Sequence, residues 1–141
     1  MLTEVLTGEH RDCDEHFQKA EALAADGRLE PAREAWQAFE AAMTTHLALE
    51  EDSLFPELEQ RTGMDGGPTD VMRMEHVQIR ALVGQMGQSL ASGDLDAFLD
   101  QTENLNILIQ QHNMKEEQML YPMFDQVFGA QAGELLEKAC G

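Results

Sequence analysis

Apolar side chains recur every three or four residues along most of the chain, with polar and charged residues between them. An early stretch shows this spacing at Val5, Leu6, Cys13, Phe17 and Ala20. A later stretch shows it again at Val71, Met72, Ile79, Val83, Met86 and Leu90. Such a period places the apolar side chains on one face of an α-helix. Because no segment shows the sustained alternation of a β-strand, the pattern predicts an all-α protein.

Short breaks divide this pattern into four long helical segments. The stretches Ala25-Asp26-Gly27 and Ser92-Gly93-Asp94 have the composition of turns, and residues 63–68 form the only stretch dense in glycine and proline. Pro56 and Pro122 fall late in the second and fourth segments, so we expect each proline to bend or end its helix.

The last residues of the chain could form one more helix. After Gly129 the chain has a spacing that suits a short fifth helix, in which Leu135 and Leu136 would dock on the end of the others.

The second half of the chain repeats the first. A shift by 66 residues superimposes the histidines, the turn glycines and several glutamates without a gap. The matches include Glu9 on Glu75, His10 on His76, Gly27 on Gly93, His46 on His112, Glu50 on Glu116, Glu51 on Glu117 and Pro56 on Pro122. They indicate a duplicated helix pair with halves at about 4–63 and 70–129. Short connections then predict an antiparallel up-down-up-down four-helix bundle in a single domain over residues 1–141.

The amino-acid composition limits the possible binding partners and the cellular compartment. The chain has 141 residues and a formal net charge of −18, which argues against binding to nucleic acid or to anionic membrane surfaces. No stretch approaches the roughly 20 apolar residues of a membrane span, and the N-terminus lacks the features of a secretory signal. The two cysteines, Cys13 and Cys140, form no recognisable motif, so we expect no disulfide framework and favour the cytoplasm.

Two His-x-x-x-Glu-Glu segments carry the candidate chemistry. A helix places residues i and i+4 on the same face, so each segment offers an imidazole and a carboxylate together. Each segment also has a partner histidine 36 residues upstream of its own. Burying these groups without a metal would leave uncompensated charge in the bundle. The sequence therefore predicts a two-metal site with six ligands: His10, His46, Glu50, His76, His112 and Glu116.

The spacing also discriminates among metal sites. Ferritin-like di-iron bundles use Glu-x-x-His, but no carboxylate stands three residues before any of the five histidines here. The His-Glu-x-x-His motif of zinc proteases is absent as well. Imidazole-rich sites bridged by carboxylates suit iron, and zinc and manganese are less favoured alternatives.

These motifs, present in register in both halves, resemble those of the hemerythrin-like (HHE cation-binding) domain family over residues 4–128. The resemblance implies a helical bundle that binds two iron ions. Carried over by position, His10 and His46 would ligate one iron, and His76 and His112 the other. By the same resemblance, the two glutamates that follow one turn after His46 and His112 would bridge the irons.

The chain departs from the oxygen-carrying hemerythrins at one position. Their third helix has a His-x-x-x-His arrangement, whereas Arg80 stands four residues after His76 here. The three-histidine iron of the carriers is therefore not formed from this helix. His16 and Asp14 are outside candidates to complete the coordination, with a place at the rim favoured for His16. The metal centre would then keep open coordination positions at which O2, NO, peroxide or water could bind.

We interpret several other side chains near the motifs as supporting or core residues rather than as metal ligands. Glu51 and Glu117 point about 100° away from the bridging glutamates, so we expect them to support the ligands or to be solvated. Tyr121 matches Phe55 in the repeat, and we favour a core aromatic at the bundle end with a solvated hydroxyl over a hydroxyl that hydrogen-bonds near the cluster or has a redox role. Cys13 is expected to be a small buried residue rather than a ligand.

The leading functional hypothesis is a non-heme di-iron protein that binds or senses O2 or a related small ligand, such as NO or peroxide. One alternative is a di-iron redox enzyme, although no further acid–base pair stands out in the sequence. A second alternative is a protein of iron storage or delivery. The sequence does not indicate an oligomeric state.

Overall fold

The computed structural model of the chain describes residues 2–64 and 67–140, with side chains described as far as residue 137. All regular structure in these ranges is helical, which confirms the predicted all-α class. The α-helices are α1 (Leu2–Ala25), α2 (Leu29–Leu49), α3 (Phe55–Thr62), α4 (Pro68–Ala91), α5 (Leu95–Lys115), α6 (Tyr121–Phe128) and α7 (Ala132–Cys140). None of the helices in this part of the chain is long and apolar enough to cross a membrane.

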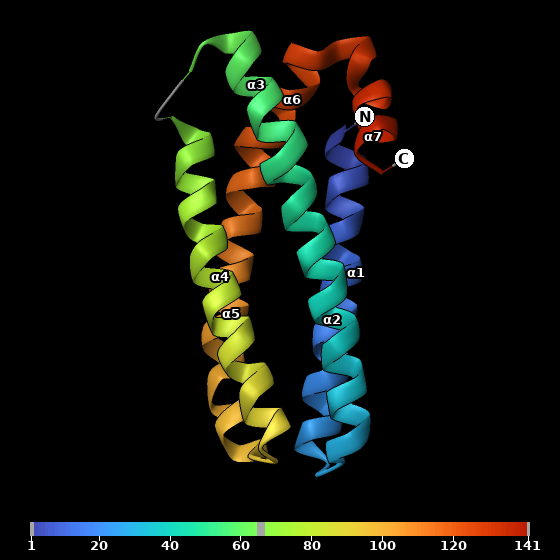
Figure 1. The fold of residues 1–141 in the computed structure, drawn as a ribbon, viewed down its shortest axis with the longest axis vertical. Helices are drawn as coiled ribbons and strands as arrows, with labels where there is room; N and C mark the ends of the chain where they lie inside the picture. The colour runs from blue at the N-terminus through green and yellow to red at the C-terminus, as the bar shows by residue number, and fades with distance from the viewer. Residues whose placement is uncertain (1, 65–66, 141) are drawn as a thin grey trace.

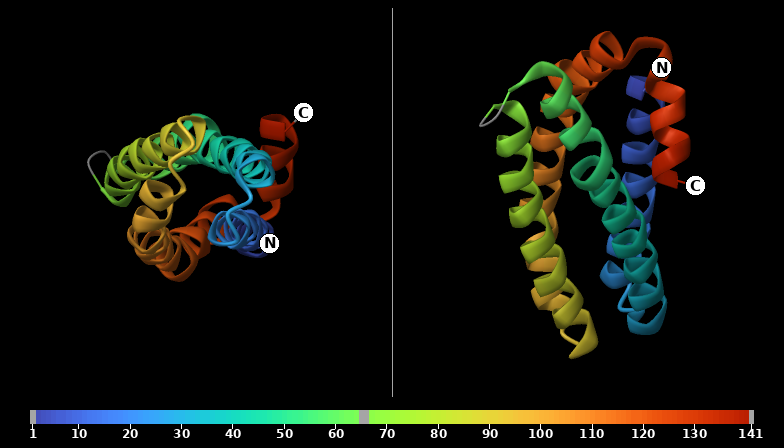
Figure 2. Two further views of the ribbon diagram at one scale, coloured as in Figure 1. Left: turned by 90° about the horizontal axis from the view of Figure 1, so that it is seen from below. Right: turned by 45° about the horizontal axis from the view of Figure 1, so that its top comes forward.

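The long helices form two pairs that lie beside each other. In Figure 1 the chain descends along α1, returns along α2 and α3, descends again along α4 and returns along α5 and α6. Viewed from below in Figure 2, the helices surround a common interior. The expected fifth helix is α7, which lies close to the start of α1 and packs Leu135 and Leu136 against a buried cluster that includes Leu2.

Glycines make the two tight turns that join the helices of each pair. Gly27 and Gly93 have φ values of +75° and +81°, a left-handed conformation that favours glycine at the end of a helix. After the second turn, the carboxylate of Asp94 accepts a hydrogen bond from the backbone N–H of Ala97 at 3.0 Å and caps α5. Both predicted breaks are confirmed. In the expected joining stretch 63–68, residues 65–66 lie outside the described part of the chain.

Neither proline ends its helix. The α2 helix continues into α3 through a π-helical segment, η1 (Glu50–Leu54), and α5 continues into α6 through a second one, η2 (Glu116–Leu120). Pro56 and Pro122 follow these segments in the first turn of α3 and α6, where a missing N–H is tolerated. The helices run on to Thr62 and Phe128, so of the two expected effects, a bend or an end, the prolines do not produce an end.

Two separate apolar clusters fill the bundle. One lies toward the two glycine turns and includes Trp36, Phe39 and Phe98. The other lies toward α3, α6 and α7 and includes Phe55 and Phe124. The four histidines and two glutamates of the predicted metal site are buried but belong to neither cluster. The polar residues therefore form a layer inside the bundle, with an apolar core on each side.

Two valines that were expected on the apolar face are instead exposed. Val5 and Val71 are 43% and 47% exposed, whereas the next residues, Leu6 and Met72, are buried. Adjacent residues are separated by about 100° around a helix, so a core-facing stripe of this width accommodates only one of each pair. The two exceptions are related by the internal repeat, which shows that both halves use the same helical register.

The aromatic side chains of the cluster near the two glycine turns provide a test of the packing. Trp36 is 1% exposed, with its ring stacked on Phe39 at 4.7 Å and edge-on to Phe98 at 4.9 Å. We expect Trp36→Ala to lower the free energy of unfolding by about 3–5 kcal/mol, because the cavity cannot close fully. Urea denaturation followed by circular dichroism measures this change. The exposed neighbour Gln37, changed to alanine, serves as the control, and equal losses in both variants would contradict this packing.

Candidate metal centre

Six side chains from four helical stretches meet in the polar layer. His10 comes from α1 and His76 from α4, while His46 and His112 lie in the last turns of α2 and α5. Glu50 and Glu116 are the first residues of the two π-helical segments. All six are buried, and both glutamates have no exposed surface. The structure thus brings together every residue of the predicted ligand set.

The six residues form two groups that share both glutamates. In the first group, made of His10, His46, Glu50 and Glu116, the potential ligand atoms all lie within 4.8 Å of one another. The second group contains His76 and His112 with the same two glutamates, within the same limit. Each histidine pair therefore belongs to one group, whereas each carboxylate belongs to both.

Distances within the first group are uniform. The Nε2 atoms of His10 and His46 are 3.1 Å apart. Nε2 of His10 lies 3.1 Å from Oε1 of Glu116, and Nε2 of His46 lies 3.4 Å from Oε2 of Glu50. Two ligands at right angles on one metal, each bonded at about 2.1 Å, would be separated by about 3.0 Å. The first group has the spacing of donor atoms around a single ion.

The second group repeats this geometry with the other oxygen of Glu50. The Nε2 atoms of His76 and His112 are again 3.1 Å apart. Nε2 of His76 lies 3.1 Å from Oε1 of Glu50, and Nε2 of His112 lies 3.2 Å from Oε1 of Glu116. Glu50 thus directs Oε2 toward the first group and Oε1 toward the second, which is the arrangement of a bridging carboxylate.

A carboxylate from another helix holds the outer nitrogen of every imidazole. The contacts from Nδ1 are 2.8 Å from His10 to Glu117, 2.7 Å from His46 to Glu9, 2.6 Å from His76 to Glu51 and 2.7 Å from His112 to Glu75. A carboxylate at Nδ1 places the ring proton there and leaves the lone pair on Nε2. The four Nε2 atoms are therefore oriented as ligands toward the two groups.

These outer carboxylates divide into expected and missed residues. Glu51 and Glu117 support the ligands, in agreement with the sequence analysis. Glu9 and Glu75 are functional residues that the motif spacing alone does not indicate. A signal for them was present, because each directly precedes a histidine, His10 or His76, at matching positions of the repeat.

The Tyr121 hydroxyl lies inside the site, so the favoured expectation of a solvated hydroxyl is wrong and the alternative of a hydrogen bond near the cluster is confirmed. Its side chain has no exposed surface. The hydroxyl donates a hydrogen bond to Oε2 of Glu50 at 2.5 Å and lies 2.9 Å from Nε2 of His10. The ring itself belongs to the apolar cluster that includes Phe124 and stacks on that residue at 6.0 Å, so the expected core aromatic at the bundle end is confirmed.

The remaining candidates lie outside both groups. His16 is half-buried, and neither it nor Asp14 belongs to either cluster of potential ligands. Asp14 instead accepts a hydrogen bond from Gln110 at 3.0 Å. Cys13 is a buried free thiol, as expected. Burial, followed by the charges of the neighbouring carboxylates, raises its pKa to about 12, so it is not a thiolate at neutral pH.

The polar layer fits a metal because its charges are otherwise incompletely compensated. Three buried side-chain atoms of the described residues have no hydrogen-bond partner: Nε1 of Trp36 in the apolar core, and Oε1 of Glu50 and Oε2 of Glu116 in the polar layer. Leaving a buried carboxylate oxygen unpaired is costly, and a cation between the groups would satisfy both oxygens. The histidine nitrogens and carboxylate oxygens match the donor types that iron, zinc and manganese accept.

Without a cation, protons must compensate the two glutamates. Burial lowers the pKa of His46, but the charge of Glu50 and hydrogen bonds to Glu50 and Glu9 outweigh it and raise this pKa to about 10. Burial likewise lowers the pKa of His76, yet its interactions with Glu116 and Glu50 raise it to about 9. Burial raises the pKa of Glu116, but hydrogen bonds from the histidines bring it well below its ordinary value. The site therefore holds positive charge strongly.

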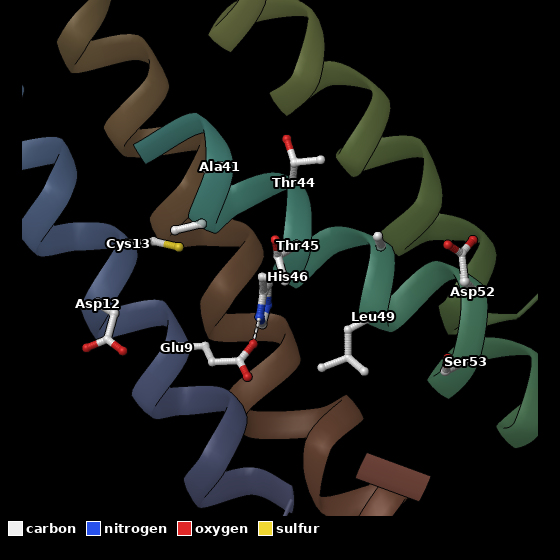
Figure 3. A pocket seen from close by; sticks show the side chains of 12 residues that line it. Glu9, Asp12, Cys13, Ala41, Thr44, Thr45, His46, Leu49, Asp52 and Ser53 are labelled. Atoms are coloured by element: carbon white, nitrogen blue, oxygen red, sulfur yellow. Dashed lines mark hydrogen bonds and ion pairs between the residues drawn. The ribbon is translucent and has the colours of Figure 1, made fainter. Parts of the chain in front are cut away.

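A surface pocket of about 810 Å³ approaches the site from one side. Figure 3 shows it between α1 and α2, with Glu9 and His46 joined by their hydrogen bond at its wall. Cys13, Leu49 and Asp52 also line it. Glu9 contacts Nδ1 of His46, so the pocket reaches the outer face of this imidazole rather than the Nε2 atom that faces the site.

Comparison with known proteins identifies one related family. The model of the hemerythrin HHE cation-binding domain matches residues 1–124. No curated protein and no solved structure matches the chain.

The raised histidine pKa values predict how the metal-free protein responds to alkali. A group whose pKa is higher in the folded than in the unfolded state stabilises fully below its unfolded value, near 6.5 here, and loses this effect as pH rises through its folded value. We therefore expect the Tm of the metal-free protein to fall as pH rises from about 7 toward 9 and 10.

Differential scanning calorimetry across this range measures the effect. Metal-loaded protein is the control, because a cation at Nε2 takes the place of the second ring proton and no imidazolium is left to titrate. A metal-free Tm that stays constant or rises up to pH 9 would contradict the account of protons on His46 and His76.

Proposed function

Because the chain belongs to the hemerythrin HHE cation-binding domain family, we propose that its bundle core holds two iron ions and that this di-iron centre binds or senses O2, NO or peroxide. The observation that carries the proposal is the pair of buried ligand groups that share Glu50 and Glu116. In this arrangement His10 and His46 would hold one iron, and His76 and His112 the other. A di-iron centre supplies redox-active metals with positions for an exogenous ligand.

The donor set supports iron over its alternatives. Four neutral imidazoles and two carboxylates suit iron, whereas zinc and manganese remain the second choices. The free cysteine that the structure describes, Cys13, is a neutral thiol and belongs to neither ligand group. The free thiol is consistent with a reducing compartment, and the cytoplasm is part of this proposal.

Small ligands suit the surroundings of the site. The two apolar clusters lie above and below the polar layer, and the six ligands are buried. Such an environment restricts access by bulk water and by large substrates. The net charge of −18 also opposes a polyanionic partner, so we propose a diatomic molecule or peroxide as the ligand rather than nucleic acid or a membrane.

One observation favours the enzymatic alternative. The Tyr121 hydroxyl lies next to both glutamates, 2.5 Å from Glu50 and 3.0 Å from Glu116. A phenol in this place could donate a hydrogen atom during reduction of peroxide or O2, which a pure binding protein does not need. Ligand binding remains our main proposal, because the four imidazoles and both glutamates of the two groups are assigned to the metals.

The bridging role gives a direct mutational test. We expect Glu116→Ala to reduce bound iron from two ions per chain to one at most, since both groups lose a ligand. Metal analysis after anaerobic loading and desalting measures the stoichiometry, with circular dichroism to confirm the helical fold. His16→Ala is the matched control and should keep both irons. A Glu116→Ala variant that retains two irons would contradict the bridging role.

Exposure to oxygen separates binding from turnover. We expect anaerobically iron-loaded protein to change its near-ultraviolet and visible absorption when O2 is admitted, and to recover the first spectrum when O2 is removed. Repeated cycles test this reversibility. A single irreversible oxidation, accompanied by steady consumption of added peroxide, would reject the binding proposal in favour of the redox enzyme.

A further inference from the structure

We propose that the two metal positions are unequal: the phenolic oxygen of Tyr121 is an additional ligand between His10 and His46, and the position between His76 and His112 accepts the exogenous ligand. This inference rests on the proposed di-iron function and adds to it a ligand and a site of binding. It follows from the contacts of one hydroxyl and from the charges around the imidazoles.

The Tyr121 oxygen contacts every member of the first group. It lies 2.9 Å from Nε2 of His10 and 3.3 Å from Nε2 of His46. It also lies 2.5 Å from Oε2 of Glu50 and 3.0 Å from Oε1 of Glu116. Neighbouring donor atoms around one metal are separated by about 3.0 Å when the bonds measure about 2.1 Å. The hydroxyl therefore has the spacing of one more donor to the same ion.

The second group has no such oxygen. Phe55 is the repeat-related residue, and its ring lies 5.6 Å from the ring of His76, much as Tyr121 lies 5.4 Å from His10. The two aromatic rings thus occupy equivalent places, but phenylalanine offers no donor atom. The position between His76 and His112 keeps only the histidines and the shared glutamates, which leaves it open to a ligand from outside.

The outer carboxylates reinforce this difference through their partners. Around the second group, Arg80 forms ion pairs with Glu51 at 2.6 and 2.9 Å, and Lys115 pairs with Glu75 at 2.5 Å. These cations withdraw negative charge from the carboxylates that hold His76 and His112. The metal bound there would receive less electron density from its imidazoles and would attract an anionic ligand more strongly.

The first group lacks these cations. In the part of the chain that the structure describes, no Lys or Arg side chain forms an ion pair with Glu9 or Glu117. The repeat places Asp14 where the other half has Arg80, and Leu49 where it has Lys115. The carboxylates behind His10 and His46 therefore keep their full charge, so the first position attracts an anionic ligand from outside less strongly than the second.

Iron spectroscopy tests the proposal without an activity assay, because Tyr121 is the only tyrosine of the chain. Binding of the phenol to ferric iron replaces its O–H bond by an O–Fe bond and releases the proton to solvent. The protein is loaded anaerobically with Fe²⁺, oxidised with ferricyanide and desalted. We expect a visible phenolate-to-iron charge-transfer band, with tyrosinate vibrations in resonance Raman spectra.

Two single-atom variants locate the ligand. Tyr121→Phe should lose the band and the vibrations while it retains two irons per chain. Phe55→Tyr places a hydroxyl at the equivalent point of the second group, so it should add a second tyrosinate signal. Wild-type protein with two irons and no tyrosinate signal would overturn the inference and leave the di-iron proposal intact. Fewer than two irons in the wild-type protein would instead reject the proposed function and this inference with it.

Azide tests which position is open. We expect the ferric wild-type protein to bind one azide per chain, and Phe55→Tyr to weaken this binding at least tenfold by closing the second position. Tyr121→Phe should bind a second azide, because the first position loses its extra ligand. Azide binding that is unchanged in Phe55→Tyr would show that the ligand does not occupy the position between His76 and His112.

Discussion

The structure depends on the burial of two carboxylates, Glu50 and Glu116, in the middle of a helical bundle. Neither side chain is exposed, and each has an oxygen without a hydrogen-bond partner. An isolated charge in an apolar interior is strongly unfavourable, so compensating groups must surround it. Four imidazoles do so from the inside, four outer carboxylates fix those imidazoles, and two apolar clusters keep the polar layer separate from solvent. These contacts explain why the buried glutamates, the imidazoles and the outer carboxylates all lie in the same polar layer of the bundle.

The internal duplication makes the site a joint product of both halves. The first ligand group takes His10, His46 and Glu50 from one half and Glu116 from the other. The second group reverses these contributions. A bound cation pair would therefore hold the two helix pairs together, and its binding free energy would contribute to folding. The same duplication allowed the halves to diverge at Tyr121 and Phe55, where the otherwise matched ligand sets differ.

Much of the fold and the six buried residues followed from the sequence, because they depend on local spacing. Helical periodicity and the turn glycines identified the helices, and the His-x-x-x-Glu spacing identified side chains on one helical face. The π-helical segments were not predictable, since they depend on tertiary contacts around Glu50 and Glu116. They shift the helical register of the residues that follow, Tyr121 among them. Glu9 lies on a different helix from His46, so their contact depends on how the helices are packed.

The central claim is that one buried layer holds two metal ions bridged by the same two glutamates. Anomalous X-ray diffraction at the iron edge, from crystals of the iron-loaded protein, tests it most directly. We predict two anomalous peaks, one between His10 and His46 and one between His76 and His112, with Glu50 and Glu116 within bonding distance of both. A single peak, or peaks outside this layer, would contradict the account.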